Sequence, residues 1–385
     1  MRTIVVDENI ALGKEAFSGL GKVEILPGRK IDRKSLTDAE ALIVRSITKV
    51  NEELLEGTPV KFVGTATIGT DHIDTDYLAS EGITFADAKG CNADAVTEYI
   101  FAAIFDILCK KKMDLQDNKL TLGIVGTGNI GSRAAKIAET MGINVLKNDP
   151  PLQRISGGND FVSLEEIFES DIITFHVPLN MEGEDKTFHL MDAGRLSRLK
   201  KNCILINSSR GSVVENSSLK KLLRERQFTA VLDVWENEPS IDTGLLENIE
   251  IGTPHIAGYS FEGKLNGTRM ICTALAKFLK VPNRKEEWIS FAPDVKDNII
   301  IFDESLNLAD SINYIFKKVY NIRRDDAELR KILNQPSGQH GSYFDLLRKQ
   351  YPLRRELSNY TVRLKKKILE LEKILKAFRM KIEYF

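Results

Sequence analysis

The amino-acid sequence predicts an α/β protein with two lobes, each built on a doubly wound parallel sheet, and a smaller domain at the C-terminal end. Three observations support this class. Short β-branched runs alternate with amphipathic helical segments, a glycine-rich turn, GTGNIG (126–131), follows one of these runs, and 385 residues are more than one hydrophobic core usually supports. We expect a flavodoxin-like substrate-binding lobe at 1–93 and 265–285, a Rossmann lobe at 94–264, and an α/β domain at 286–385.

The first lobe is predicted from four short apolar runs. They are TIVVDEN (3–9), ALIVRS (41–46), KFVGTA (61–66) and ITFAD (83–87). Two long amphipathic helices, expected at about 94–110 and 260–279, would carry the chain out of this lobe and return it. Because both helices join the same two lobes, we expect a catalytic cleft between the lobes.

The second lobe is predicted from six strand-like runs separated by helical segments. These runs lie at 120–126, 144–149, 171–177, 203–209, 229–235 and 249–253. In the first intervening helix, apolar residues recur at helical spacing from Ile130 to Met141, and Gly142 ends the helix. Ser163 and Glu166 have the spacing of a capping box before a later helix. Strands and helices that alternate in this way indicate a parallel, doubly wound sheet.

The character of the chain changes after residue 281, where VPNRKEEWISFAPDVK (281–296) is typical of a linker. A new strand is expected in NIIIF (298–302), and helical spacing follows from Ala309 to Val319. A second helical stripe runs from Leu364 to Phe378, before the strand-like MKIEYF (380–385). These features predict a small α/β domain of about 100 residues, which is long enough to fold alone.

Charge and cysteine content exclude several classes of protein. The 54 basic and 55 acidic residues nearly cancel, which leaves no electrostatic footprint for nucleic acid or an anionic membrane. The cysteines, Cys91, Cys109, Cys203 and Cys272, are far apart and form no disulfide framework or zinc-binding pattern. The most apolar helical stretch is too short to span a bilayer. We therefore expect a cytoplasmic protein that binds no metal.

The glycine-rich turn is the strongest local motif. It leaves a strand and opens a helix, which is the context in which GxGxxG binds a dinucleotide rather than only making a turn. The residues assigned to the cofactor in this segment are Gly126, Gly128, Asn129, Ile130 and Gly131. Asp149 ends the next predicted strand, where its carboxylate would bind ribose hydroxyls and repel a 2′-phosphate. We therefore expect NAD as the cofactor.

Three charged residues follow later strands of the second lobe. Arg210, Glu238 and His255 each lie just beyond one of the last three predicted strands, at the edge where doubly wound sheets bind ligands. Oxidation of a 2-hydroxy acid needs a guanidinium for the carboxylate, a base for the hydroxyl proton and a partner that holds the base. Each residue alone could be an ordinary surface or turn residue. Their order behind a dinucleotide motif predicts a dehydrogenase site.

Several longer segments resemble the D-isomer-specific 2-hydroxyacid dehydrogenases. They are VDEN (6–9), LIVRSITKVNEELL (42–55), KFVGTATIGTDHID (61–74), GCNADAVTEY (90–99), NDPP (148–151), TFHVPL (174–179), LDVWENEP (232–239), HIAGYSFEGK (255–264) and NIRRDDAELRK (321–331). The general family accounts for roughly the first 280 residues, and resemblance to one subgroup persists to about Glu356. This resemblance implies a small phosphorylated 2-hydroxy acid as substrate and a homodimer formed through the C-terminal domain.

The resemblance also assigns roles to individual residues. It implies that Arg210 binds the substrate carboxylate, His255 takes the hydroxyl proton and Glu238 pairs with His255. Substrate contacts are implied for Ser46, Thr67 and Tyr259. Further cofactor contacts are implied for Val177, Ser208, Ser209, Asp233 and Gly258. Val177 departs from the pattern, since a relative has threonine there, and the Ser208–Ser209 pair replaces a different small pair.

Two other functions stay open at this point. One is another dehydrogenase of the same family, such as a phosphoglycerate dehydrogenase, because its catalytic residues would be the same. The other is an interaction protein that keeps the fold as an NAD sensor.

Arginines of the C-terminal domain are usually solvated or paired, but one of them could reach a substrate phosphate across a dimer interface, as could Arg45. These arginines are Arg323, Arg324, Arg330, Arg354 and Arg355.

Overall fold

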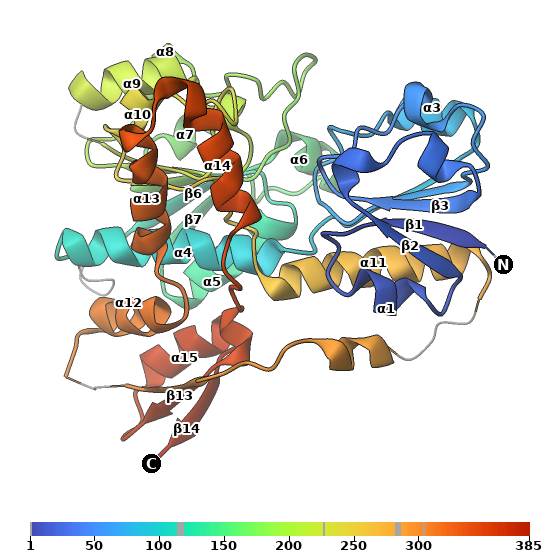
Figure 1. Cartoon of the computed structure of the whole chain (residues 1–385). Coiled ribbons are helices and arrows are strands. Elements are labelled where there is room, and N and C mark those ends of the chain that lie inside the picture. The colour runs from blue at the N-terminus through green and yellow to red at the C-terminus, as the bar shows by residue number, and fades with distance from the viewer. Residues whose placement is uncertain (1, 114–118, 226–227, 282–285, 303–304) are drawn as a thin grey trace. The chain divides into compact units, whose positions relative to one another are not determined.

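The computed structural model describes residues 2–113, 119–225, 228–281, 286–302 and 305–385, so part of the expected linker, residues 282–285, lies outside it. The described chain forms two units, which can be followed by colour in Figure 1. Unit 1 contains Met1–Asn92 and Ser260–Lys296, and unit 2 contains Ala93–Tyr259 and Asp297–Phe385. No helix in the described ranges is long and apolar enough to cross a bilayer.

Unit 1 contains a parallel sheet with the strand order β2-β1-β3-β4-β5, which confirms the flavodoxin-like prediction. Its strands are β1 (Thr3–Asp7), β2 (Lys22–Leu26), β3 (Ala39–Val44), β4 (Phe62–Thr65) and β5 (Thr84–Asp87). One face is covered by α1 (Gly13–Phe17) and α11 (Phe261–Phe278), and the other by α2 (Glu52–Leu55) and α3 (Thr75–Ser80). β2 is not among the predicted strands, because this edge strand is partly exposed throughout and gives a weak apolar pattern.

The larger sheet of unit 2 is also parallel and has the order β11-β10-β9-β8-β6-β7. Its strands are β6 (Thr121–Val125), β7 (Asn144–Asn148), β8 (Ile172–Phe175), β9 (Ile204–Asn207), β10 (Thr229–Leu232) and β11 (Ile251–Gly252). These strands confirm the six predicted runs. The chain passes from β6 to β7 on one side and then to β8 on the other, so the topological switch point lies between β6 and β8.

Helices connect these strands. They are α4 (Ala93–Lys110), α5 (Asn129–Thr140), α6 (Pro150–Ser156), α7 (Leu164–Ile167), α8 (Ala193–Leu196), α9 (Asn216–Glu225) and α10 (Thr243–Leu246). The predicted capping box of Ser163 and Glu166 starts α7. α4 differs from the amphipathic prediction, because it is buried on nearly all sides, including the polar residues Glu98 and Asp106. It packs against α5 and against helices of the C-terminal part of the chain.

In the residues that the structure describes, the C-terminal part of unit 2 contains a three-stranded parallel sheet and four α-helices. These elements are β12 (Ile299–Ile301), β13 (Thr361–Leu364), β14 (Lys381–Tyr384), α12 (Leu308–Val319), α13 (Ile322–Arg330), α14 (His340–Lys349) and α15 (Leu369–Ala377). α12 packs against α4, α15 against α5 and α13 along β11 (Figure 1). Ile312 and Leu371 belong to the same buried cluster as Ile100 and Ile124. The C-terminal part therefore shares its hydrophobic core with the larger sheet.

Candidate active site

The glycine-rich turn lies between β6 and α5, beside the switch point of the larger sheet. Gly126 has a φ of 88°, and a Cβ there would lie 2.6 Å from the carbonyl oxygen of His176, which follows β8. A Cβ on Gly131 would lie 2.0 Å from the carbonyl oxygen of Gly126, so both positions require glycine. At Gly128, in contrast, no described atom lies within 4 Å of the Cβ position. A pyrophosphate can therefore approach the backbone of Gly128 and the first N–H groups of α5.

Asp149 lies at the end of β7, and three hydrogen bonds fix its carboxylate. Oδ2 accepts from the backbone N–H and the hydroxyl of Thr127 at 2.7 and 3.1 Å, and Oδ1 accepts from the N–H of Leu152 at 3.1 Å. Because a carboxylate has about four acceptor positions, capacity remains for a ribose hydroxyl. Val177 lies at the switch point, since its Cγ1 is 2.9 Å from the Cβ position of Gly126.

Two serines follow β9 at the same edge of the sheet. The hydroxyl of Ser209 donates to Oδ1 of Asn207 at 2.8 Å, whereas Oγ of Ser208 is buried without a hydrogen-bond partner among the residues described. A buried hydroxyl without a partner is costly, and a bound ligand could satisfy it. With the open backbone of Gly128 and the carboxylate of Asp149, these residues fit a dinucleotide.

His255 and Glu238 form a hydrogen-bonded pair in the loops that follow β11 and β10. Nδ1 of His255 lies 2.7 Å from Oε2 of Glu238, whose Oε1 accepts from the backbone N–H of Trp235 at 2.9 Å. Burial raises the pKa of Glu238, but the charge of His255, their hydrogen bond and the Trp235 N–H outweigh burial and hold this pKa below its ordinary value. The ionised carboxylate can therefore hold the Nδ1 proton, which leaves Nε2 as the basic atom.

The buried carboxylate of Asp233 shapes the loop that carries His255. It accepts hydrogen bonds from the hydroxyl of Thr253 at 2.7 Å and from the backbone N–H groups of Ile256 and Ala257 at 2.8 and 2.9 Å. Burial raises the pKa of Asp233, although the charge of His255 and these hydrogen bonds oppose that effect. His255 has a φ of 57°, an unfavourable conformation for a residue other than glycine. Asp233 therefore supports a strained loop, a role that the sequence does not predict.

Arg210 lies in the loop after β9, and this loop packs against the loop that carries Glu238. A Cβ on Gly211 would lie 2.0 Å from the carbonyl group of Trp235, so the two backbones are in direct contact. The guanidinium of Arg210 donates to the carbonyl oxygen of Ser209 at 2.8 Å. Unit 2 thus brings the loops of Arg210, Glu238 and His255 to one edge of its sheet.

Ser46 and Thr67, which the resemblance assigns to the substrate, belong to unit 1. Ser46 is exposed in the turn after β3. Oγ1 of Thr67 lies 2.7 Å from Oγ1 of Thr65 and donates to the carbonyl oxygen of Gly69 at 3.0 Å. Oγ1 of Thr65 in turn lies 3.1 Å from Nε2 of His72, whose pKa is lowered by burial. Unit 1 therefore offers the hydroxyl of Thr67, which its neighbours hold in place, and the exposed hydroxyl of Ser46.

Two contacts near these loops are not predicted from the sequence. His189 forms a second histidine–glutamate pair, with Nε2 2.5 Å from Oε1 of Glu236. Arg348, in α14, has its guanidinium carbon 5.9 Å from the ring centroid of Tyr259. Both contacts join segments that are far apart in the sequence, and no local motif marks either of them.

Several arginines of the C-terminal domain have partners within their own chain, and the hypothesis that one of them reaches a substrate phosphate across a dimer interface stays a prediction. Arg323, Arg330 and Arg354 bind carboxylates and backbone carbonyl groups of their own chain. Arg324 forms an ion pair with Asp325 at 3.6 Å.

Comparison with known proteins places this site in context. Residues 109–257 match the family described as D-isomer specific 2-hydroxyacid dehydrogenase, NAD binding domain, and residues 291–376 match a domain of unknown function. Erythronate-4-phosphate dehydrogenase of Pseudomonas fluorescens is 42% identical over 97% of this chain and 98% of its own, and that of Photorhabdus laumondii is 45% identical over 93% and 94%. The structure of D-lactate dehydrogenase from Aquifex aeolicus, complexed with NAD and lactic acid, is 29% identical. It covers 72% of this chain and 95% of its own, with a TM-score of 0.59.

Proposed function

The chain belongs to the D-isomer specific 2-hydroxyacid dehydrogenases, among the erythronate-4-phosphate dehydrogenases, and from that premise we propose how its residues act. It oxidises 4-phospho-D-erythronate at C2 to (R)-3-hydroxy-2-oxo-4-phosphobutanoate, with NAD as the cofactor. This reaction would serve the biosynthesis of pyridoxine 5′-phosphate, a form of vitamin B6. The observation that carries the proposal is the pair of His255 and Glu238 in loops next to the loop of Arg210.

Arg210 would bind the substrate carboxylate and fix the position of C2. Its guanidinium stays charged at any physiological pH and can donate two parallel hydrogen bonds to a carboxylate. Ser46, Thr67 and Tyr259 would supply further hydroxyl groups for the substrate.

His255 would act as the general base. Glu238 holds the Nδ1 proton, so Nε2 can take the proton of the C2 hydroxyl, and the carboxylate then stabilises the imidazolium. NAD, when bound, accepts the hydride that leaves C2. The O–H and C2–H bonds break, the C2 carbonyl forms, and the proton stays on His255 until it is released to solvent.

The switch point of the larger sheet would hold the cofactor. The proposed contacts are made by Gly126, Gly128, Asn129, Ile130, Gly131, Asp149, Val177, Ser208, Ser209, Asp233 and Gly258. The carboxylate of Asp149 would repel the 2′-phosphate of NADP, which favours NAD.

The protein would work as a homodimer in the cytoplasm, formed through the C-terminal sheet. Ile299 and Ile301 lie on one side of β12 and are 46% and 62% exposed, which is unusual for isoleucine. Light scattering should show a dimer for the full chain and a monomer for Ile301→Asp. A monomeric full chain would contradict this part of the proposal.

The substrate assignment is tested by NADH production from the full chain, with 4-phospho-D-erythronate and 3-phosphoglycerate in parallel. A strong preference for 4-phospho-D-erythronate is expected. Preference for 3-phosphoglycerate would retain the catalytic residues and overturn the substrate. NAD binding without turnover of either acid would favour an NAD-responsive interaction protein instead.

A further inference from the structure

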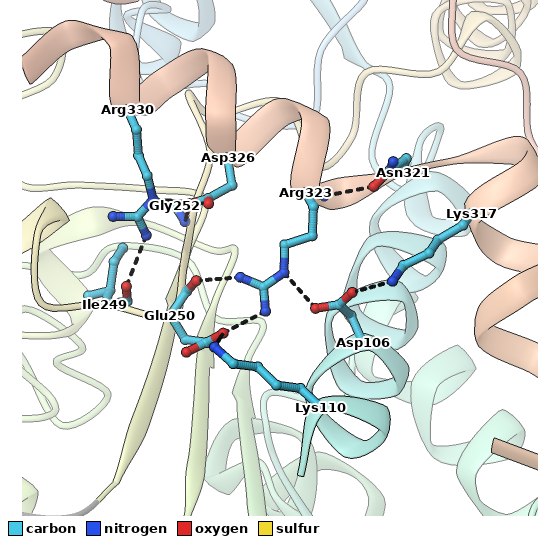
Figure 2. Close-up of polar contacts among 10 residues, drawn as sticks. All are labelled: Asp106, Lys110, Ile249, Glu250, Gly252, Lys317, Asn321, Arg323, Asp326 and Arg330. Atoms are coloured by element: carbon cyan, nitrogen blue, oxygen red, sulfur yellow. Dashed lines mark hydrogen bonds and ion pairs between the residues drawn. The ribbon is translucent and has the colours of Figure 1, made fainter. Parts of the chain in front are cut away.

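Helix α13 is hydrogen-bonded to β11, the strand that precedes His255, and to the residues just before that strand. Figure 2 shows how its polar side chains bind the edge strand β11 and the residues before it. Oδ1 of Asp326 accepts from the N–H of Gly252 at 2.8 Å, Arg323 donates to the carbonyl oxygen of Glu250 at 2.8 Å, and Arg330 donates to that of Ile249 at 3.0 Å. These bonds occupy backbone groups along the open edge of the sheet.

Alternating charges fix the same helix to α4. Arg323 binds Oδ2 of Asp106 and Oε1 of Glu250, both at 2.6 Å (Figure 2). Lys317 lies 2.8 Å from Oδ1 of Asp106, and Lys110 lies 2.6 Å from Glu250. A network of this kind holds its geometry better than an isolated ion pair does. The start of the C-terminal part is therefore fixed relative to β11.

A second anchor follows α14. Arg354, whose side chain is 2% exposed, donates to the carbonyl oxygens of Ala257 at 3.0 Å and Ala95 at 2.8 Å. Its guanidinium lies 3.5 Å from Glu98 and stacks 3.8 Å from the ring centroid of Tyr320. Ala257 belongs to the loop that carries His255. Helix α14 is thus held between two anchors that both bind the catalytic loop or its strand.

Arg348, in the last turn of α14, faces this loop. Its guanidinium lies over the ring of Tyr259, and its ion pair with Asp345 is loose, at 4.0 Å. Nε is buried and has no hydrogen-bond partner in the described part of the chain, while 26% of the side chain is accessible. Burial lowers the pKa of Arg348, but Tyr259 and Glu238 outweigh burial and keep the guanidinium charged. A charged group with five donors is therefore only partly satisfied within the chain.

We propose that Arg348 binds the phosphate of the substrate, so that the C-terminal part of the chain completes the active site. This inference rests on the proposed function. Arg210 would hold the carboxylate at one end of the acid, and the phosphate at the other end carries a charge of about −1.5 to −2, which suits a second guanidinium. Tyr259, beside Arg348, is the residue of unit 2 that the resemblance assigns to the substrate.

The coverage of the relatives agrees with this assignment. The D-lactate dehydrogenase, whose bound acid has no phosphate, covers 72% of this chain, whereas the erythronate-4-phosphate dehydrogenase of Pseudomonas fluorescens covers 97%. The additional share is similar in size to the C-terminal part. A phosphate-binding residue contributed by that part would distinguish the two substrate classes.

The test compares Arg348→Gln, Arg348→Lys and the control Lys349→Gln, which removes an exposed charge from the next residue of the same helix. kcat/KM is measured for 4-phospho-D-erythronate and for D-erythronate, and the ratio of the two values reports recognition of the phosphate. Arg348→Gln should lower this ratio about 10-fold to 100-fold, as expected for loss of a charged hydrogen bond. Arg348→Lys should lower it less, and Lys349→Gln should leave it unchanged.

Inhibition by inorganic phosphate provides a second readout that does not depend on turnover of D-erythronate. Phosphate should compete with the phosphorylated acid in the wild-type enzyme and in Lys349→Gln, and much more weakly in Arg348→Gln. An unchanged ratio with unchanged phosphate inhibition in Arg348→Gln would overturn the proposal. Equal losses on both acids would also overturn it, and would make Arg348 a positioning residue for Glu238. A wild-type enzyme inactive on 4-phospho-D-erythronate would instead refute the proposed function.

Discussion

One loop of unit 2 carries two glutamates, and each of them binds a histidine. Glu236 lies 2.5 Å from Nε2 of His189, and Glu238 lies 2.7 Å from Nδ1 of His255. The two pairs are also similarly accessible, with histidine side chains 30% and 36% exposed. A search for histidine–carboxylate pairs would therefore find both, and the distance alone does not indicate which pair could act in the proposed reaction.

The surroundings of the two pairs differ. Oε2 of Glu236 accepts from the N–H of Asn216, whose Oδ1 accepts from the N–H of Glu236, and His189 stacks on Phe188 at 4.0 Å. These contacts tie a loop to the start of α9 and use Nε2 of the histidine. His255 uses Nδ1 instead, so its Nε2 is left for a substrate. The free ring nitrogen and the neighbouring loops, rather than the pair itself, therefore favour His255 over His189 as the general base.

Replacement of His255, the proposed base, should have the largest effect on turnover. His255→Asn removes the base, so kcat should fall about 10²-fold to 10⁴-fold. NAD binding, followed by fluorescence titration, should be retained, since the turn at Gly126–Gly131 is unaffected. A kcat close to that of the wild type would remove the distinction between the two pairs.

Loss of the charge on Glu238 should have a smaller effect. Glu238→Gln can keep a hydrogen bond to His255, but it no longer stabilises the imidazolium, and kcat should fall about 10-fold to 100-fold, part of the full contribution of acid–base catalysis. Glu236→Gln is the matched control on the same loop, and its kcat should stay within about twofold of the wild-type value. Equal losses in the two variants would indicate that the loop acts as a structural whole.

The second histidine should matter for stability and not for chemistry. His189→Asn loses the bond to Glu236 and the stacking on Phe188, so the free energy of unfolding in urea should fall by about 1–2 kcal/mol. Its kcat should be nearly that of the wild type. A large loss of kcat in a folded His189→Asn enzyme would assign this pair to the reaction as well.

His176, unlike His189 and His255, has no carboxylate bonded to it in the described structure. Burial lowers its pKa to about 3, so the folded state keeps the ring neutral while the unfolded chain takes up a proton below pH 6.5. The contribution of the neutral His176 ring to the free energy of unfolding should therefore be present in full above pH 6.5. It should be lost as the pH falls, by about 1 kcal/mol between pH 6.5 and 5.5. His176→Asn should lose less over this interval in urea unfolding. Equal losses in the two proteins would show that His176 does not cause the effect.

Local patterns predict much of the fold and the position of the candidate cofactor site. The six strands of the larger sheet, the capping box at Ser163 and the turn at Gly126 follow from rules that act within a few residues. Arg210, Glu238 and His255 could be located because parallel strands end at one edge of the sheet. The edge strand β2 is missed, since its half-exposed residues leave little periodicity.

Contacts between distant segments could not be predicted from the sequence. In the sequence, Asp106 is a polar residue within an apolar helix, and nothing nearby explains its burial. The explanation is Arg323, more than two hundred residues later, which binds its carboxylate. The pairing of His189 with Glu236 and the approach of Arg348 to Tyr259 have the same origin. Spacing rules describe neighbours along the chain, whereas these contacts depend on how whole elements pack.

Isotope transfer shows whether this site takes a hydride from C2 of 4-phospho-D-erythronate. The substrate is labelled with deuterium at C2, the full chain is supplied with NAD, and the reduced cofactor is examined by mass spectrometry and NMR. We expect one deuterium on the nicotinamide ring and none in the 2-oxo product. Deuterium retained in the product or lost to water, or unlabelled NADH, would contradict it.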